Sequence, residues 1–146
     1  MTPAELVAAL HAEAERANER RLLTLAGARD RGLDAARDAL GALDDPDATL
    51  LTTREGVGTH PNDADRLLGT TRDAVVLDCH DGFSANVLGR VVGAVDGGGL
   101  LVLVTPPLDA WPGSDYADER FAVPPATAAD VTGHFRRRLV DTLRAH

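Results

Sequence analysis

The chain has 146 residues, a common length for one domain, and 44% of them are hydrophobic, as in ordinary globular proteins. Its formal net charge is −8, and none of its 15 Lys-plus-Arg residues is a lysine. An acidic domain is a poor general binder of nucleic acids, which are held largely by lysine and arginine. One cysteine excludes an intramolecular disulfide. Since no apolar run approaches about 20 residues and no signal peptide is evident, we expect a cytoplasmic protein without a membrane span.

The first third of the sequence predicts a helix, a buried strand and a second helix. The opening TPAE (residues 2–5) is a capping box with proline at the first helical position, and helical spacing continues to about Asn18. The run 21–27 is expected to be a strand, and Asp30 is expected to cap the next helix. That helix has apolar residues every three or four positions, at Leu33, Ala36, Leu40 and Leu43.

The middle of the sequence predicts three more strands. Residues 48–53 form the second strand, a short helix lies around 63–68, and 74–79 form the third strand. Ser84 is expected to cap a helix with a wide apolar stripe, and 99–107 form the fourth strand. We expect the preceding glycines to end that helix and turn the chain into the strand.

Short apolar strands alternating with amphipathic helices indicate βαβ units. Runs such as LLTL, VVL and LLVLV suit strands that are buried on both faces. The sequence therefore predicts one α/β domain over residues 1–146. Its fold is expected to be Rossmann-like and three-layered, with a mostly parallel sheet of about four strands flanked by helices.

The last part of the chain combines a long loop with a helix. The segment 106–126 lacks clear periodicity but contains Trp111, Tyr116 and Phe121, so we interpret it as an excursion anchored by Trp111; a partner-binding loop is the alternative. A second capping box, at 127–130, opens the final helix. Its three consecutive arginines, 136–138, lie about 100° apart on a helix, so they are expected to fan around the solvent side.

The sequence Asp78-Cys79-His80-Asp81 contains residue types that catalyse reactions. Neighbouring residues of a strand point to opposite faces, so Cys79 and His80 do not form a nucleophile–base pair there, whereas Asp78 and His80 share a side. They lie at the carboxyl end of a parallel strand, where open α/β folds bind ligands. We interpret the acids as strand-ending residues, Cys79 as a small core residue and His80 as a polar loop residue. The other histidines show no metal-ligand spacing with His80.

A second candidate site is GARDRG, residues 27–32, which follows the first strand and opens a helix. Phosphate-binding turns occupy this position, and Arg29 and Arg31 could contact a phosphate there. However, the segment lacks the inner glycine of GxGxxG and the Lys-Ser/Thr of a Walker A loop. Acids at 30, 78 and 81 are expected to repel phosphate.

Several blocks of the chain resemble, in order, the N-terminal domain of the tRNA-methionine cytidine acetyltransferase family in its archaeal, salt-adapted form. They are RRLLTLAGARDRGLDAARDAL, LLTTREG, LLGTTRDAVVLDCHDGFSANVLGRVVGAVDGGGLLVLVTPP with the Trp-Pro at 111–112, and DVTGHFRRRLVDTLRAH. The resemblance implies a protein that takes part in acetylating N4 of the wobble cytidine of elongator tRNA(Met), using acetyl-CoA and ATP or GTP with Mg. In that family the domain precedes helicase-like and acetyltransferase modules, which would be its partners.

The sequence ends at His146 before any Walker A or acetyl-CoA loop, so no catalytic or nucleotide-binding residue of the family can be assigned here. The resemblance therefore implies a non-catalytic domain without its own cofactor or metal, touching tRNA(Met) weakly or indirectly. The alternative is a stand-alone Rossmann-like module with a nucleotide or cofactor at its strand ends. Candidate ligand or RNA contacts are Arg29, Arg31, Arg54, Asp78, His80, Arg136 and Arg137.

The charge composition predicts a dependence of stability on salt. Self-repulsion in a chain of net charge −8 destabilises the compact state, and dissolved ions screen it. The thermal unfolding midpoint should therefore rise from low to molar potassium chloride. A flat or falling midpoint would contradict this dependence, and a GC-rich genome, which favours arginine over lysine, would then suffice to explain the missing lysines.

Overall fold

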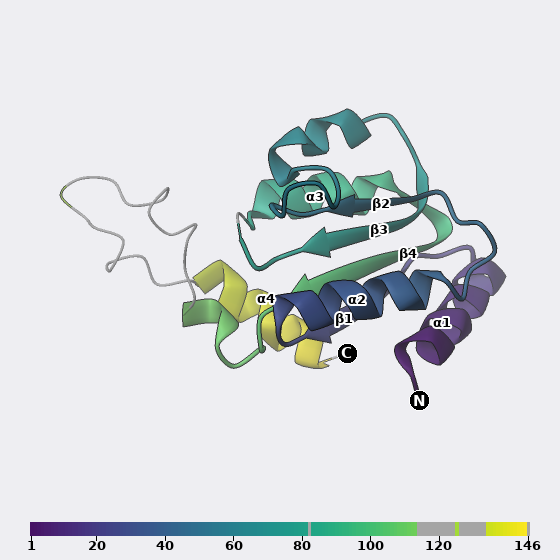
Figure 1. The fold of residues 1–146 in the computed structure, drawn as a ribbon, viewed down its shortest axis with the longest axis horizontal. Coiled ribbons are helices and arrows are strands. Elements are labelled where there is room, and N and C mark those ends of the chain that lie inside the picture. Colours follow the sequence, from purple (N-terminus) through teal and green to yellow (C-terminus); the bar gives the residue numbers. More distant parts are fainter. Residues whose placement is uncertain (82, 114–124, 126–133, 146) are drawn as a thin grey trace.

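The computed structural model describes residues 1–81, 83–113, 125 and 134–145, and these form an α/β arrangement of three layers (Figure 1). The strands are β1 (Arg21–Ala26), β2 (Ala48–Leu51), β3 (Arg72–Asp78) and β4 (Val95–Thr105). They form one all-parallel sheet in the order β1-β4-β3-β2. The α-helices are α1 (Pro3–Ala17), α2 (Arg29–Leu40), α3 (Ala85–Ala94) and α4 (His134–Ala145), and the 3-10 helices are η1 (Pro61–Leu67) and η2 (Trp111–Gly113). The predicted fold class is confirmed.

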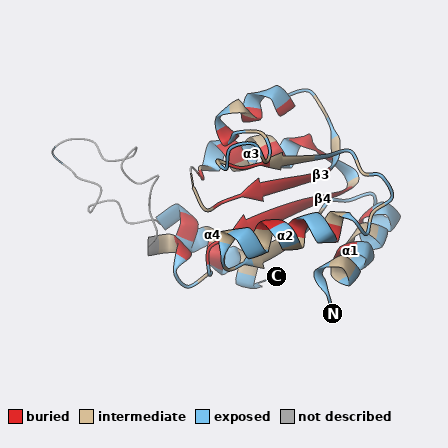
Figure 2. Cartoon of the chain, viewed as in Figure 1, coloured by how far each residue is buried: buried red, intermediate tan, exposed pale blue. Residues whose placement is uncertain are grey.

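Each face of the sheet contributes to its own hydrophobic cluster. On one face, alternate residues of the strands pack against α1 and α2 through side chains such as Val7 and Leu33. On the other face, the remaining residues pack against α3, η1, Trp111 and Val140 of α4. The two central strands, β3 and β4, are buried along most of their length (Figure 2). This double burial explains why their sequences are apolar runs rather than alternating patterns.

Of the three helix caps predicted within the described residues, two are confirmed. Thr2 Oγ1 accepts from the backbone N–H of Glu5, whose carboxylate accepts from the Thr2 backbone, so the capping box is confirmed. Ser84 accepts from the backbone N–H of Val87, as expected. The prediction for Asp30 is wrong: α2 begins at Arg29, its N-cap is Ala28, two positions before Asp30, and no side chain caps it. Asp30 lies in the first helical turn, where a carboxylate interacts favourably with the helix dipole.

The glycines at 97–99 belong to β4 instead of a turn before it, which corrects the sequence prediction. β4 pairs Val95 with Arg72 and then resumes at Leu100 with Ala74, so the register shifts where the glycines lie. Gly98 has φ +85°, and its N–H donates to the carbonyl of Glu19. At Gly99 a Cβ atom would lie 2.8 Å from the carbonyl oxygen of Asp73. Glycine is needed here because the strand is irregular and closely packed.

Smaller differences concern element ends. The second helix stops at Leu40, short of the predicted Leu43, and the short helix at 61–67 is a 3-10 helix. Trp111 is buried and meets Phe83 edge-on with 5.2 Å between ring centroids, which confirms Trp111 as an anchor. Tyr116, Phe121 and the capping box at 127–130 lie outside the described residues. Among the helices that the structure describes, none is long and apolar enough to cross a bilayer.

Candidate functional site

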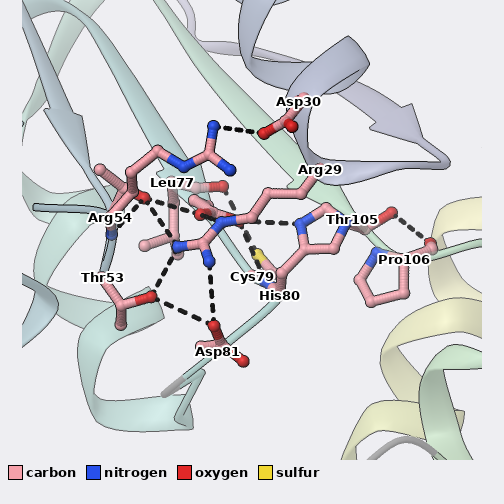
Figure 3. A network of polar contacts seen from close by, with 12 residues as sticks. Arg29, Asp30, Thr53, Arg54, Leu77, Cys79, His80, Asp81, Thr105 and Pro106 are labelled. Carbon is pink, nitrogen blue, oxygen red and sulfur yellow. Dashed lines mark hydrogen bonds and ion pairs between the residues drawn. The ribbon is translucent and has the colours of Figure 1, made fainter. Parts of the chain in front are cut away.

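Polar side chains gather where β1, β2 and β3 end, at the carboxyl edge of the sheet (Figure 3). Gly27 and Arg29 follow β1, Thr52 and Thr53 follow β2, and Asp78 is the last residue of β3. His80 and Asp81 come directly after it. Parallel strands end at the same edge, so residues distant in sequence meet here. We call the set Arg29, Thr52, Thr53, Asp78, His80 and Asp81 the carboxyl-edge network.

Arg29 is the centre of the carboxyl-edge network. Its Nε donates to Asp78 Oδ2 at 2.7 Å, and its Nη1 donates to Asp81 Oδ2 at 3.0 Å. Its Nη2 donates to the hydroxyl oxygens of Thr52 and Thr53 at 3.1 and 2.6 Å. Every guanidinium nitrogen is therefore engaged, and two of them face carboxylates. A phosphate could bind Arg29 only by displacing those acids.

The side chain of Asp78 has no solvent exposure, and both of its carboxylate oxygens accept hydrogen bonds from protein groups. Besides Arg29, it accepts from the Thr52 hydroxyl at 2.7 Å and from the backbone N–H and Nδ1 of His80 at 3.1 and 2.8 Å. Burial disfavours the carboxylate, but the hydrogen bonds from His80 and Thr52, aided by the Arg29 charge, outweigh it and lower the pKa of Asp78 to about 2. Asp78 is thus ionised throughout the neutral range.

His80 has an acceptor next to each ring nitrogen. Nδ1 lies 2.8 Å from the Asp78 carboxylate, and Nε2 lies 3.0 Å from the carbonyl oxygen of Gly27. Neither oxygen can donate a proton, so both contacts are hydrogen bonds only when both nitrogens carry hydrogen. Burial opposes the charged ring, but the hydrogen bonds to Asp78 and Gly27 prevail and raise the pKa of His80. The geometry therefore selects the imidazolium form.

The carboxyl-edge network is consequently balanced in charge. Arg29 and His80 are cationic, and Asp78 and Asp81 are anionic, so the formal charges cancel. An imidazolium with both N–H groups occupied has no lone pair with which to act as a general base. Arg29, Asp78 and His80 therefore tie strand ends together and offer no free acid or base to a substrate, whereas the Asp81 carboxylate is 43% exposed.

Cys79 does not add a nucleophile to this edge. Its side chain is buried in the cluster that contains Trp111, on the opposite side from Asp78 and His80. Burial, together with the negative charge of Asp78, raises the pKa of the thiol well above its usual value. Since the thiolate is the reactive form, Cys79 is inert as a nucleophile. Its interpretation as a small core residue is confirmed, as is the shared side of Asp78 and His80. His80 does follow the strand, but it is mostly buried and bonded at both nitrogens rather than a simple polar loop residue.

The other candidate residues of the α2 region are less enclosed. Arg54 forms an ion pair with Asp30, which joins the β2 loop to the start of α2. Arg31 is exposed and lines an open cavity of about 400 Å³ between the end of β1 and the first turns of α2. Thus Arg29 and Arg31, adjacent to the same turn, differ in role: only Arg31 faces an accessible space.

The arginines of α4 depart from the sequence prediction. Arg136 is 7% exposed and its Nη2 donates to the carbonyl oxygen of Pro112 at 3.1 Å, so it does not lie on the solvent side. Arg136 shares the inward face of α4 with Val140, four residues on, because positions i and i+4 are stacked on a helix. Arg137 and Arg138 are exposed, as expected. The structure does not bring these arginines into the carboxyl-edge network.

Sequence reasoning missed Thr52 and Thr53 as partners in the network. The available signal was a pair of hydroxyl residues directly after an apolar strand, at the edge where the other strands also end. Their contact with Arg29 spans 23 and 24 residues, so only the strand arrangement reveals it. Within the portion that the structure describes, no group of three or more His, Cys, Asp or Glu side chains could hold a metal ion.

The carboxyl-edge network predicts a pH dependence that can be isolated by substitution. His80 has a raised pKa in the folded state, so its stabilising effect is complete below the unfolded pKa of about 6.5 and is lost as the pH rises through the folded value. The unfolding free energy of the wild type minus that of His80→Gln should therefore decrease as the pH rises above about 6.5. Denaturant unfolding at each pH measures it. A constant or increasing difference would show that His80 is neutral in the folded protein.

The comparisons with known proteins agree on one family. The model of the tRNA(Met) cytidine acetyltransferase TmcA N-terminal family matches residues 1–146. A tRNA(Met) cytidine acetyltransferase TmcA of Haloferax volcanii is 61% identical over 97% of this chain, and that of Haloarcula marismortui is 50% identical over 99%. That of Nitrosococcus halophilus is 36% identical over 96%. In each case the matched stretch is about one fifth of the relative, 20, 20 and 19% of its length. The chain therefore belongs to the family of tRNA(Met) cytidine acetyltransferase N-terminal domains.

Proposed function

We propose that this chain is the non-catalytic N-terminal domain of a tRNA(Met) cytidine acetyltransferase. It would support ATP-dependent N4-acetylation of the wobble cytidine of elongator tRNA(Met) through its architecture or by positioning the RNA. The family match over residues 1–146 and the one-fifth share of the relatives support a part of a larger enzyme.

The observation that carries the non-catalytic role is the charge-balanced network at the carboxyl edge. This edge is where an open parallel sheet places a ligand or an active site. Here Arg29 and His80 have all their nitrogens engaged by protein acceptors, and Asp78 has no solvent exposure. Cys79 points into the core. Arg29, Asp78 and His80 are instead used to hold the strand ends in place.

Under this proposal the remaining activities reside in other parts of the enzyme. Acetyl-CoA and ATP or GTP with Mg would bind helicase-like and acetyltransferase modules, which are the expected partners of this domain. Direct contact with tRNA(Met) would be weak and would involve exposed arginines such as Arg31, Arg137 and Arg138, which have no acidic partner in the described part of the chain. The enzyme is proposed to act in the cytoplasm, consistent with a single, unpaired cysteine.

The test is the acetylation rate of the full-length enzyme with substitutions at the carboxyl edge. Cys79→Ala and His80→Gln should each retain the rate within about threefold, since a well-used acid–base group contributes about 10²–10⁴-fold. Val75→Ala, a buried truncation on the same strand without acid–base chemistry, controls for loss of stability. A loss of about a hundredfold or more in a folded Cys79 or His80 variant, not shared by Val75→Ala, would show a catalytic role.

The alternative is a stand-alone Rossmann-like module, and the cavity beside Arg31 is the feature that favours it. Its volume of about 400 Å³ is within the range of small-molecule sites, and Gly27 leaves it open on the side of the turn. Calorimetric titration of the 146-residue chain with ATP, S-adenosylmethionine and acetyl-CoA should show no dissociation constant in the micromolar range. Micromolar binding that Arg31→Ala abolishes would establish the alternative.

A further inference from the structure

The two outer edges of the sheet differ in the hydrogen bonds that their backbone groups make. On the outer side of β2, Thr59 donates its N–H to the carbonyl of Leu50 at 2.8 Å and accepts from the N–H of Thr52 at 2.9 Å. The loop after β2 therefore occupies that edge. Leu51 and Thr59 accordingly form an isolated parallel β-bridge. On the outer side of β1, no backbone hydrogen bond joins the strand to any other segment that the structure describes.

Backbone geometry identifies the groups at the β1 edge. The N–H of Gly27 donates to the carbonyl of Thr105 in β4, and successive residues of a strand direct their backbone groups to alternate sides. Leu22, Thr24 and Ala26 therefore direct their N–H and C=O groups away from β4. A regular row of such groups is a template for another strand. Proline and charged side chains commonly prevent an edge strand from pairing with another strand. The six residues of β1 include no proline, and only Arg21, at its start, is charged.

Leu22 and Ala26 add apolar side chains to this edge. Leu22 and Thr24 are in register with Leu101 and Leu103, so they point to the face on which α4 packs with Val140. That face is well covered over β4 but not over β1, where Leu22 is 44% exposed. Thr24 and Ala26 also line the open cavity at the end of β1. The edge, its apolar side chains and the cavity are thus continuous.

We propose that β1 is completed by an added strand from the part of the enzyme that follows residue 146. This strand would pair with the backbone of Leu22, Thr24 and Ala26 and place its own apolar side chains beside Leu22, extending the sheet to five strands. The inference rests on the proposed function, because it requires the longer polypeptide. It identifies the surface through which the domain joins the rest of the enzyme.

A tethered segment fits this edge better than a second copy of the chain. Six residues of strand pairing bury less surface than the roughly 1,200 Å² of a stable complex between separate molecules. Two copies would each bring a charge of −8, which opposes association. A segment of the same polypeptide has an effective concentration that can reach the millimolar range, so a small interface suffices. The relatives have about four fifths of their length outside the matched stretch.

Hydrogen exchange measured amide by amide tests the pairing. In the 146-residue chain the amides of Leu22, Thr24 and Ala26 should exchange rapidly, while those of Leu23 and Leu25, which face β4, are protected. In the full-length enzyme the first three should slow by about tenfold or more. Equal exchange in the two proteins would overturn the proposal, whether the amides are fast in both or already slow in the shorter chain. Slowing that appears in the 146-residue chain only at high concentration would assign the edge to a second copy and also overturn it.

A pair of matched substitutions provides a second test of the strand pairing. Leu22→Lys and Val92→Lys replace apolar residues of nearly equal exposure, 44 and 43%, on β1 and on α3. In the 146-residue chain each should shift the unfolding midpoint by no more than about 2 °C. In the full-length enzyme, only Leu22→Lys should remove the added protection at 24 and 26. Retention of that protection in Leu22→Lys, or its equal loss in Val92→Lys, would contradict a specific strand site.

The acetylation assay separates this inference from the proposed function. A full-length protein that acetylates tRNA(Met) but leaves the β1 amides unprotected would refute the added strand alone. A protein that protects these amides but has no such activity would refute the acetyltransferase assignment and keep the edge interface.

Discussion

Burial of the Asp78 carboxylate is the constraint on which the carboxyl edge of this domain depends. A buried charge is costly unless it is paired and hydrogen-bonded, and removing one partner of such a pair leaves an uncompensated charge. Asp78 obtains its partners from three chain segments: Arg29 after β1, Thr52 after β2 and His80 after its own strand. Each partner must therefore hold its position for the carboxylate to remain buried. The contact of His80 with the Gly27 carbonyl extends this requirement across the end of β4, which lies between β1 and β3.

The hydrogen bonds that compensate the buried charge of Asp78 also distinguish this network from a catalytic site built on a His–Asp pair. In an acid–base site, neighbouring groups are tuned so that one can gain a proton and another can lose one near neutral pH. Here the pKa of Asp78 falls to about 2 and that of His80 rises, as in any ion pair, and the distinction lies in the protein groups that occupy both residues. In a nucleophile–His–Asp arrangement the far ring nitrogen faces a nucleophile. In this protein it faces a backbone carbonyl, so the ring bridges two strand ends.

The sequence was sufficient for features that depend on local periodicity. Strand alternation placed Asp78 and His80 on one side and Cys79 in the core, and the capping patterns placed the starts of α1 and α3. It was insufficient where the outcome depends on contacts between distant segments. Arg29 meets its acids across 49 and 52 residues, a pairing set by strand order. On α4, periodicity gives the angles between arginines but not which one turns inward. The long stem of Arg136 can be buried with its charged end bonded to a carbonyl, so Arg136 turns inward, whereas its neighbour Phe135 is 47% exposed and stacks on Phe83.

The distribution of charge bears on how such a domain can be joined to others. Several of its cations are paired internally, as in Arg29–Asp78, Arg54–Asp30 and Arg21–Glu13, and the net charge of the chain is −8. At molar salt the Debye length is about 3 Å, so attraction between exposed charges contributes little to docking. Backbone hydrogen bonds and apolar burial do not require long-range attraction, and a strand edge offers both over a short length. With the β2 edge occupied by Thr59 and the carboxyl edge closed by balanced charges, the outer side of β1 is the place in the described sheet where these two interactions can still form.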